Sequence, residues 1–205
     1  IEPKSIYKSV KKVSAGHFIS TNINQIHDLT EQPYWRLEDY LSSEKSDVNS
    51  LKDEFKTLLN DSVRMRMVAD VQVGVFLSGG VDSSVILANM TKHSTQPVKT
   101  SSIGFDLSAY DESYYAEKVA KYYRCDHVTT SVSVNDLSLV DKIVEIYDEP
   151  FADNSAIPTY ILSQATNQYV KVALSGDGAD ELLFGYRNHQ MFLFEERLRK
   201  IIPKF

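Results

Sequence analysis

A glycine-containing turn in the middle of the chain carries residue types that bind phosphate. The apolar run 71–77 leads into the sequence SGGVDSS at residues 78–84, and a helical pattern begins directly afterwards. Glycines let backbone N–H groups approach a ligand closely, and Ser83 and Ser84 lie where hydroxyls and the helix dipole can meet an anion. The segment predicts a phosphate-binding loop. It is not the common nucleoside-triphosphate loop, because the pattern GxxxxGKS or GxxxxGKT is absent from the chain.

Asp82 adds a negative charge to a turn that is suited to anions. A carboxylate beside phosphate is favourable when Mg²⁺ bridges them, because Mg²⁺ is usually held by one or two carboxylates together with phosphate oxygens. The alternative is structural: Asp82 caps the following helix, and the glycines only make a tight turn.

A second turn of similar type follows the apolar run 170–174. It has the sequence SGDGADE at residues 175–181, with carboxylates at Asp177, Asp180 and Glu181. Acidic residues in the first turn of a helix are also favoured by the helix dipole, which is the structural alternative for Asp180 and Glu181. If the strands before the two turns are neighbours in a sheet, Asp82 and Asp180 can share one metal ion.

The elements that must position these turns alternate between strand and helix. Strands are expected at 71–77, 98–105, 127–132 and 170–174, and helices at 46–67, 83–92, 111–123, from about 133 to before 150, and from about 155. This alternation predicts an α/β fold, a doubly wound, mostly parallel sheet with helices on both faces. Ligands of such sheets bind at the carboxyl ends of the strands, where both turns fall.

The first part of the chain differs from the rest. Residues 6–13 and 17–21 alternate polar and β-prone residues around Gly16, which predicts a β-hairpin. We interpret residues 1–45 as a connector from a preceding domain, and residues 46–205 as the nucleotide-binding domain. The first residue is Ile1, not Met, so we expect a piece of a longer protein.

Several segments together resemble the synthetase domain of the glutamine-hydrolysing asparagine synthetase family. SGGVDSS looks like the pyrophosphate loop of ATP pyrophosphatases, and SGDGADE resembles the partner motif of asparagine synthetases. SIGF at 102–105, YDES at 110–113 and DEPFADNSAIPTY at 148–160 are similar to segments of the same family. IYKSVKKVSAGHFI and the later YW resemble its connector to the glutaminase domain. The resemblance covers nearly the whole chain and implies a Rossmann-like fold of the adenine nucleotide alpha hydrolase type.

The resemblance implies a role for each residue of the two turns. The residues that would hold the β- and γ-phosphates are Ser78, Gly79, Gly80, Asp82, Ser83 and Ser84. Asp82 and Asp180 would bind Mg²⁺. Phe76 and Ile103 would line the adenine pocket, and the backbone of Ser175 and Gly176 would approach the nucleotide. Asp177 would lie beside the acyl-adenylate.

The implied activity is an ATP-dependent amide-forming ligation. A carboxylate, in this family the side chain of aspartate, is adenylated with release of pyrophosphate and then amidated with ammonia from glutamine, giving asparagine and AMP. Two alternatives stay open. One is a diverged amidotransferase acting on a sugar acid, a peptide or a β-amino acid, and the other is a non-catalytic nucleotide-binding relative.

Two departures from the family pattern affect these expectations. Family members often continue the second motif as DELFGGY, whereas this chain has DELLFGY, so that Phe184 replaces a glycine. The sequence also lacks the glutaminase domain with its catalytic cysteine, and the C-terminal helical part with a lysine that stabilises the second step. We therefore expect the fragment to be inactive on its own.

Composition narrows the class of protein further. The formal net charge of −6 and the pI near 5.4 argue against a broad nucleic-acid-binding face. No apolar run is long enough to span a membrane, and the single cysteine, Cys125, cannot form an internal disulfide. We expect a cytoplasmic enzyme with small-molecule substrates and an inert, structural Cys125. Homodimerisation is left open.

Overall fold

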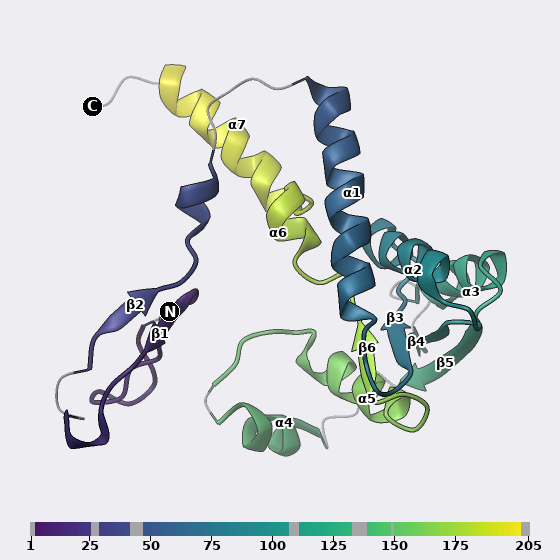
Figure 1. Cartoon of the computed structure of the whole chain (residues 1–205), viewed down its shortest axis with the longest axis horizontal. Coiled ribbons are helices and arrows are strands. Elements are labelled where there is room, and N and C mark those ends of the chain that lie inside the picture. Colours follow the sequence, from purple (N-terminus) through teal and green to yellow (C-terminus); the bar gives the residue numbers. More distant parts are fainter. Residues whose placement is uncertain are drawn as a thin grey trace. The chain divides into compact units, whose positions relative to one another are not determined.

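The computed structural model describes residues 3–25, 29–41, 47–106, 111–132, 139–148 and 150–201 (Figure 1). The chain forms two compact units, Ile1–Lys52 with Ser138–Asn154, and Asp53–Leu137 with Ser155–Phe205. The second unit contains both turns that the sequence singles out.

The first unit is built from short elements. Strands β1 (His17–Ile19) and β2 (Glu31–Pro33) pair antiparallel, and short 3-10 helices at Ile23–Gln25 and Leu37–Tyr40 accompany them. Helix α4 (Val140–Tyr147) belongs to the same unit, and Tyr147 stacks on Phe151 with ring centroids 4.1 Å apart.

The predicted hairpin of residues 6–13 with 17–21 is wrong. His17–Ile19 pairs with Glu31–Pro33, and the segment before it makes its own antiparallel bridge between Lys4 and Lys11. Gly16 does adopt a left-handed conformation, with φ of 69°, but its carbonyl accepts hydrogen bonds from Tyr34 and Trp35. The local alternation of residue types therefore predicted a strand at His17–Ile19 correctly. It did not predict the partner strand, which lies farther along the chain.

The second unit contains a four-stranded parallel sheet in the order β5-β4-β3-β6. The strands are β3 (Val73–Phe76), β4 (Lys99–Phe105), β5 (Asp126–Val132) and β6 (Val172–Leu174). Register pairs Val75 with Thr100 on one side and with Leu174 on the other. The α/β fold with a parallel sheet is confirmed.

Helices cover this sheet on both faces. Side chains of β3 alternate, so Val73, Val75 and Leu77 enter the hydrophobic core whereas Phe76 faces the opposite side. Residues of α1 (Val48–Arg66), α2 (Val81–His93) and α3 (Ser113–Tyr122) complete that core. The core members are Val63, Val73, Val75, Leu77, Leu87, Met90, Val98, Ala116 and Ala120. Helix α5 (Ala156–Thr166) lies on the side of Phe76, where Tyr160 and Thr166 share a cavity lining with it.

The chain changes direction within the sheet between β3 and β6. From β3 it proceeds to β4 and β5 on one side, and it then returns to place β6 on the other side of β3 (Figure 1). In doubly wound sheets this reversal opens a crevice at the carboxyl ends of the two strands that flank it, here β3 and β6. The two glycine-containing turns follow these strands, because one begins after β3 and the other after β6.

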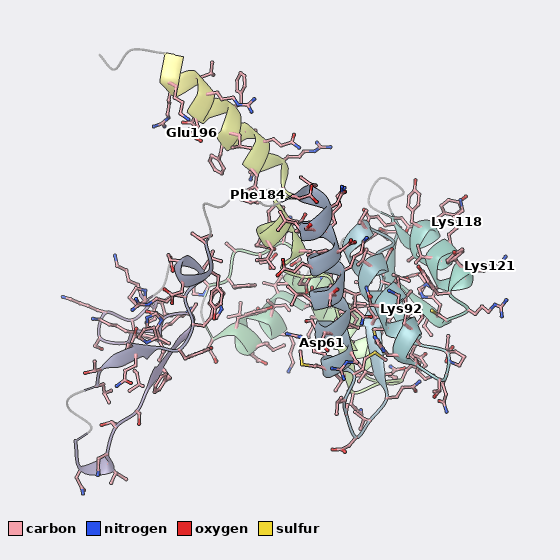
Figure 2. All side chains as sticks on the ribbon, turned by 45° about the horizontal axis from the view of Figure 1, so that its top comes forward. Asp61, Lys92, Lys118, Lys121, Phe184 and Glu196 are labelled. Carbon is pink, nitrogen blue, oxygen red and sulfur yellow. The ribbon has the colours of Figure 1, made fainter. Side chains whose placement is uncertain are left out.

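The tyrosines between residues 114 and 123 are buried to different extents. Their helical spacing is typical of half-buried core or interface residues, but Tyr114, Tyr115 and Tyr122 are exposed, whereas Tyr123, just after α3, packs against the core. In Figure 2, Lys118 and Lys121 project outward from the same helix, and the Lys118 ammonium lies 4.2 Å from the Tyr114 ring centroid. Helical spacing therefore predicted that these tyrosines lie on a helix. It did not predict how far neighbouring elements bury each side chain.

After β6 the chain forms α6 (Ala179–Leu183) and α7 (Arg187–Ile201). No helix in the described part of the chain combines the length and apolar character needed to cross a membrane. Cys125 is half-buried at the edge of the core, and burial raises the pKa of its thiol to about 11. This value supports the inert, structural role expected for Cys125.

Candidate functional site

The first turn is held by hydrogen bonds among its own residues. Ser83, in the first turn of α2, accepts a hydrogen bond from the Ser78 backbone N–H at 3.2 Å, and the two serine hydroxyls lie 3.0 Å apart. The Gly80 N–H donates to the Ser78 hydroxyl at 3.2 Å. These contacts fold Ser78–Gly80 tightly over the start of α2, as a phosphate-binding loop requires.

Two features of position 79 require glycine: its backbone conformation and the lack of space for a side chain. Its φ is 81°, a left-handed value that favours glycine. A Cβ at this position would lie 2.5 Å from the backbone nitrogen of Ala116 and 2.6 Å from the carbonyl carbon of Tyr115. The loop therefore packs directly against the first turns of α3, which fixes its position relative to β4 and β5.

The second turn is organised around Ser175. Its hydroxyl donates to the Asp177 carboxylate at 2.9 Å and accepts from the Asp177 backbone N–H at 3.4 Å. Gly178 follows with φ of 89° and begins α6, whose first turn contains Asp180 and Glu181. The side chain of Asp177 is exposed, so it is accessible to a substrate.

The two turns are in contact with each other. A Cβ on Gly176 would lie 2.8 Å from the Ser83 backbone nitrogen and 3.0 Å from the Asp82 Cβ. The contact exists because β3 and β6 are hydrogen-bonded neighbours, with Val73 opposite Val172. A shared site was expected if the strands that precede the two turns are neighbours in the sheet. These strands do lie side by side.

The donor set fits a phosphate group with a hard cation. Ser84 Oγ is buried and has no hydrogen-bond partner among the described residues, so it is available to a ligand oxygen. Asp82 and Asp180 are each half-buried in the first turn of their helices. Within the described ranges, no cluster of three or more His, Cys, Asp or Glu residues has a metal-binding arrangement. This set agrees with Mg²⁺, which needs few carboxylates when phosphate supplies oxygens. The shared ligation by Asp82 and Asp180 stays a prediction.

The residues predicted for the adenine pocket lie on one face of the sheet. Phe76 pairs in register with Ser101, and Ile103 follows two positions later on the same side of β4. Both side chains are half-buried. Phe76 lines an open cavity of about 490 Å³ between the sheet and α5. The other lining residues are Tyr160, Ser163, Gln164, Thr166, Asn167, Val170, Lys171 and Ala173. Their contact with adenine stays a prediction.

Asp111, from the YDES segment, holds the connection between β4 and α3. Its Oδ1 accepts hydrogen bonds from the backbone N–H of Ser113 at 3.1 Å and of Phe105 at 3.4 Å. Hydrogen bonds from Ser113 keep the pKa of the Asp111 carboxyl below its usual value. Asp111 thus connects the end of β4 to the first residue of α3, the helix against which the first turn packs. The segment 148–160 is divided between the two units.

The turn after α6 contributes features that the sequence patterns did not predict. Tyr186 donates a hydrogen bond from its hydroxyl to Glu181 Oε1 at 2.6 Å, and this bond lowers the pKa of the Glu181 carboxyl. Phe184 ends α6 in a left-handed conformation, with φ of 58° and ψ of 40°. The replacement of a family glycine by Phe184 was the available signal that this turn is unusual.

Comparison with known proteins places the chain in a family. The asparagine synthase family profile matches residues 54–203. The chain is 39% identical over 205 residues to a putative glutamine-hydrolysing asparagine synthetase 2 of Methanocaldococcus jannaschii, covering 99% of this chain and 39% of that protein. It is 34% identical over 186 residues to glutamine-hydrolysing asparagine synthetase 1 of Bacillus subtilis, covering 90% of this chain and 29% of that protein.

Among solved structures, a glutamine-dependent NAD⁺ synthetase from Acinetobacter baumannii in complex with ADP matches 78% of this chain and 32% of that chain. Its TM-score is 0.48 and its sequence identity is 18%.

The chain belongs to the asparagine synthase family, as its motifs predicted. It spans 39% of the length of the archaeal relative and 29% of the length of the relative from Bacillus subtilis.

Proposed function

We propose that the protein is the synthetase part of an ATP-dependent amide-forming ligase. The observation that carries this proposal is the contact between its two serine-glycine turns, where a Cβ on Gly176 would lie 2.8 Å from the Ser83 nitrogen. That contact brings the serines and glycines of the first turn and the acidic residues of α6 to one end of two adjacent parallel strands. Such a site suits a nucleotide whose phosphates react with a second substrate.

The reaction begins from a carboxylate, which does not react with ammonia at neutral pH. An oxygen of the carboxylate attacks the α-phosphorus of ATP, and the bond to the β-phosphate oxygen breaks, so that an acyl-adenylate forms and pyrophosphate leaves. Ammonia then attacks the acyl carbon, loses a proton and displaces AMP. The product is the amide. Glutamine hydrolysis supplies the ammonia in the intact protein.

The chain's own groups stabilise the departing pyrophosphate. Backbone N–H groups of Gly79 and Gly80 and the hydroxyls of Ser78, Ser83 and Ser84 surround its oxygens. Asp82 and Asp180 would hold Mg²⁺, which would offset the negative charge that builds on the leaving group. Asp177 lies at the exposed edge of the second turn, where it faces the acyl-adenylate. Phe76 and Ile103 contact adenine from the sheet.

Two forms of this proposal differ in the acceptor acid. Aspartate is the acceptor that family membership favours, and a sugar acid, a peptide or a β-amino acid is the alternative. A non-catalytic nucleotide-binding protein is a different class of function. It predicts ATP binding without turnover, in contrast to either ligase. Cytoplasmic location and homodimerisation stay predictions.

The test uses the intact gene product with ATP, Mg²⁺, glutamine and a panel of carboxylic acids. We expect AMP and pyrophosphate in equal amounts, and only when an acceptor acid is present. Release of ADP and phosphate contradicts adenylation. ATP binding without pyrophosphate release for every acid favours the non-catalytic alternative.

A further inference from the structure

The turn between α6 and α7 contains a residue whose conformation is unfavourable for its type. Phe184 has φ of 58°, and the N–H of the next residue, Gly185, donates to the Asp180 carbonyl at 3.0 Å to close the turn. A left-handed backbone costs free energy for any residue with a Cβ, and glycine avoids that cost. The DELFGGY pattern that this segment resembles has glycine here, so Phe184 carries a conformational cost that glycine would avoid.

Packing in the described chain does not explain Phe184. Its side chain is 67% exposed, at the turn labelled in Figure 2. Its ring makes one edge-to-face contact, with His189 at a centroid distance of 5.2 Å. The neighbouring residues Leu182, Leu183 and Tyr186 are exposed as well. A strained residue that stabilises no core is a reason to look for a functional contact.

The turn lies directly beside the acidic residues of the site. Gly185 packs against the Asp180 carboxylate so closely that any side chain there would overlap it. Tyr186 donates to Glu181 at 2.6 Å, which joins the far side of the turn to the same short helix. An apolar surface at this point is therefore adjacent to Asp180 and Glu181, which belong to the site of the proposed ligase reaction.

His189 adds a directional polar group to this surface. Its ring centroid lies 5.5 Å from that of Tyr186 and 5.2 Å from that of Phe184. Its Nδ1 is buried and has no hydrogen-bond partner among the described residues. A buried ring nitrogen without a partner is costly, and a polar group of a bound molecule would satisfy it.

We propose that Phe184, Tyr186 and His189, which we call the aromatic cluster, bind the non-reacting part of the acceptor acid. The acceptor carries an apolar or aromatic substituent that contacts Phe184, together with a polar group that reaches His189. Aspartate has no such substituent, so the cluster favours the alternative acceptor class, of which a substituted β-amino acid is the member tested below. This inference rests on the proposed ligase function and names its acceptor.

The test measures acid-dependent pyrophosphate release by the intact protein with a matched pair of acids. β-Alanine and 3-amino-3-phenylpropanoate have the same reacting carboxylate and differ by one phenyl group, and aspartate is the third acid. We expect kcat/KM for the phenyl acid to exceed that for each of the other acids by about 10-fold or more, the discrimination an apolar contact can supply. In Phe184→Gly the preference should fall by about the same factor.

The variants separate specificity from folding. Phe184→Gly removes the unfavourable conformation, so it should fold at least as well as the wild type. Phe184→Leu keeps an apolar side chain and should keep part of the preference. Phe192→Ala, on the exposed surface of α7, is the matched control and should leave the ratio of the two rates unchanged.

Two results would overturn the inference in different ways. Pyrophosphate release with aspartate as the best acid, at a ratio that Phe184→Gly does not change, removes the specificity role while leaving the ligase function in place. Absence of pyrophosphate release with every acid removes the proposed function and the acceptor assignment together.

Discussion

Replacement of Gly176 by alanine is the sharpest test of whether the two turns form one site. The new Cβ would lie 2.8 Å from the Ser83 nitrogen and 3.0 Å from the Asp82 Cβ. Carbon contacts are optimal at about 3.5–4.0 Å, so the turns must separate by roughly 0.7 Å. Neither neighbour is the end of a flexible side chain, and the backbone of one turn must therefore move.

The displacement falls on the groups that are proposed to bind phosphate. A misplacement of about 1 Å can reduce a rate about 100-fold, so we expect Gly176→Ala to lower kcat/KM for acid-dependent pyrophosphate release by roughly 10- to 100-fold. The overpacking should cost about 1–3 kcal/mol of stability, which thermal unfolding measures. The assay is pyrophosphate release by the intact protein at a temperature where both forms are folded.

Gly178→Ala is the matched control, because it separates steric contact from conformational cost. A Cβ on Gly178 would meet nothing within 4 Å, but its φ of 89° makes any side chain unfavourable. It should therefore lower stability with a smaller loss of activity than Gly176→Ala. If Gly176→Ala keeps the wild-type kcat and KM, the contact between the turns does not position the reacting groups, and the single-site argument is wrong.

Three further predictions concern the proposed metal pair, the half-buried His127 and the cysteine. Asp82→Asn and Asp180→Asn should each abolish pyrophosphate release, and the double variant should be scarcely worse than either, whereas an active Asp180→Asn protein would refute the shared metal. Burial lowers the pKa of His127 below its usual 6.5, so the folded state loses stability as pH falls below about 6.5. Urea unfolding from pH 8 to 5 should show this loss, and His127→Gln should flatten it. The thiol pKa of about 11 predicts that Cys125 reacts with iodoacetamide at pH 8 far more slowly than free cysteine; a rate equal to that of free cysteine would contradict it.

The sheet and its turns were predictable because their signals are local. Valine-rich runs ending in serine and glycine specify a strand followed by a tight turn, and β3 and β6 appear inside the ranges 71–77 and 170–174. Family resemblance then connected two turns that periodicity alone could not place together. Their proximity depends on the pairing of β3 with β6, which no local pattern encodes.

The errors arose where a distant segment decides the structure. Residues 17–21 were expected to pair with 6–13, but β1 pairs with Glu31–Pro33, and this choice depends on contacts beyond a short window. The exposure of Tyr115 depends on which elements cover α3, and helical spacing does not show this. The left-handed conformation of Phe184 was not predictable from its residue type, because this backbone conformation is unfavourable for a residue with a side chain.

The pairing of β3 with β6 also determines when the site can assemble during folding. Val73 and Val172 are 99 positions apart, so the contact closes a long loop and has a high contact order. Strand β6 has three residues and lies at the edge of the described sheet, where strands are the first to open. The turn that carries Asp177 and Asp180 therefore depends on a late and weakly held strand. A nucleotide that binds both turns would stabilise the pairing of β6 with β3. Its binding should therefore slow amide hydrogen exchange in β6 more than in β4.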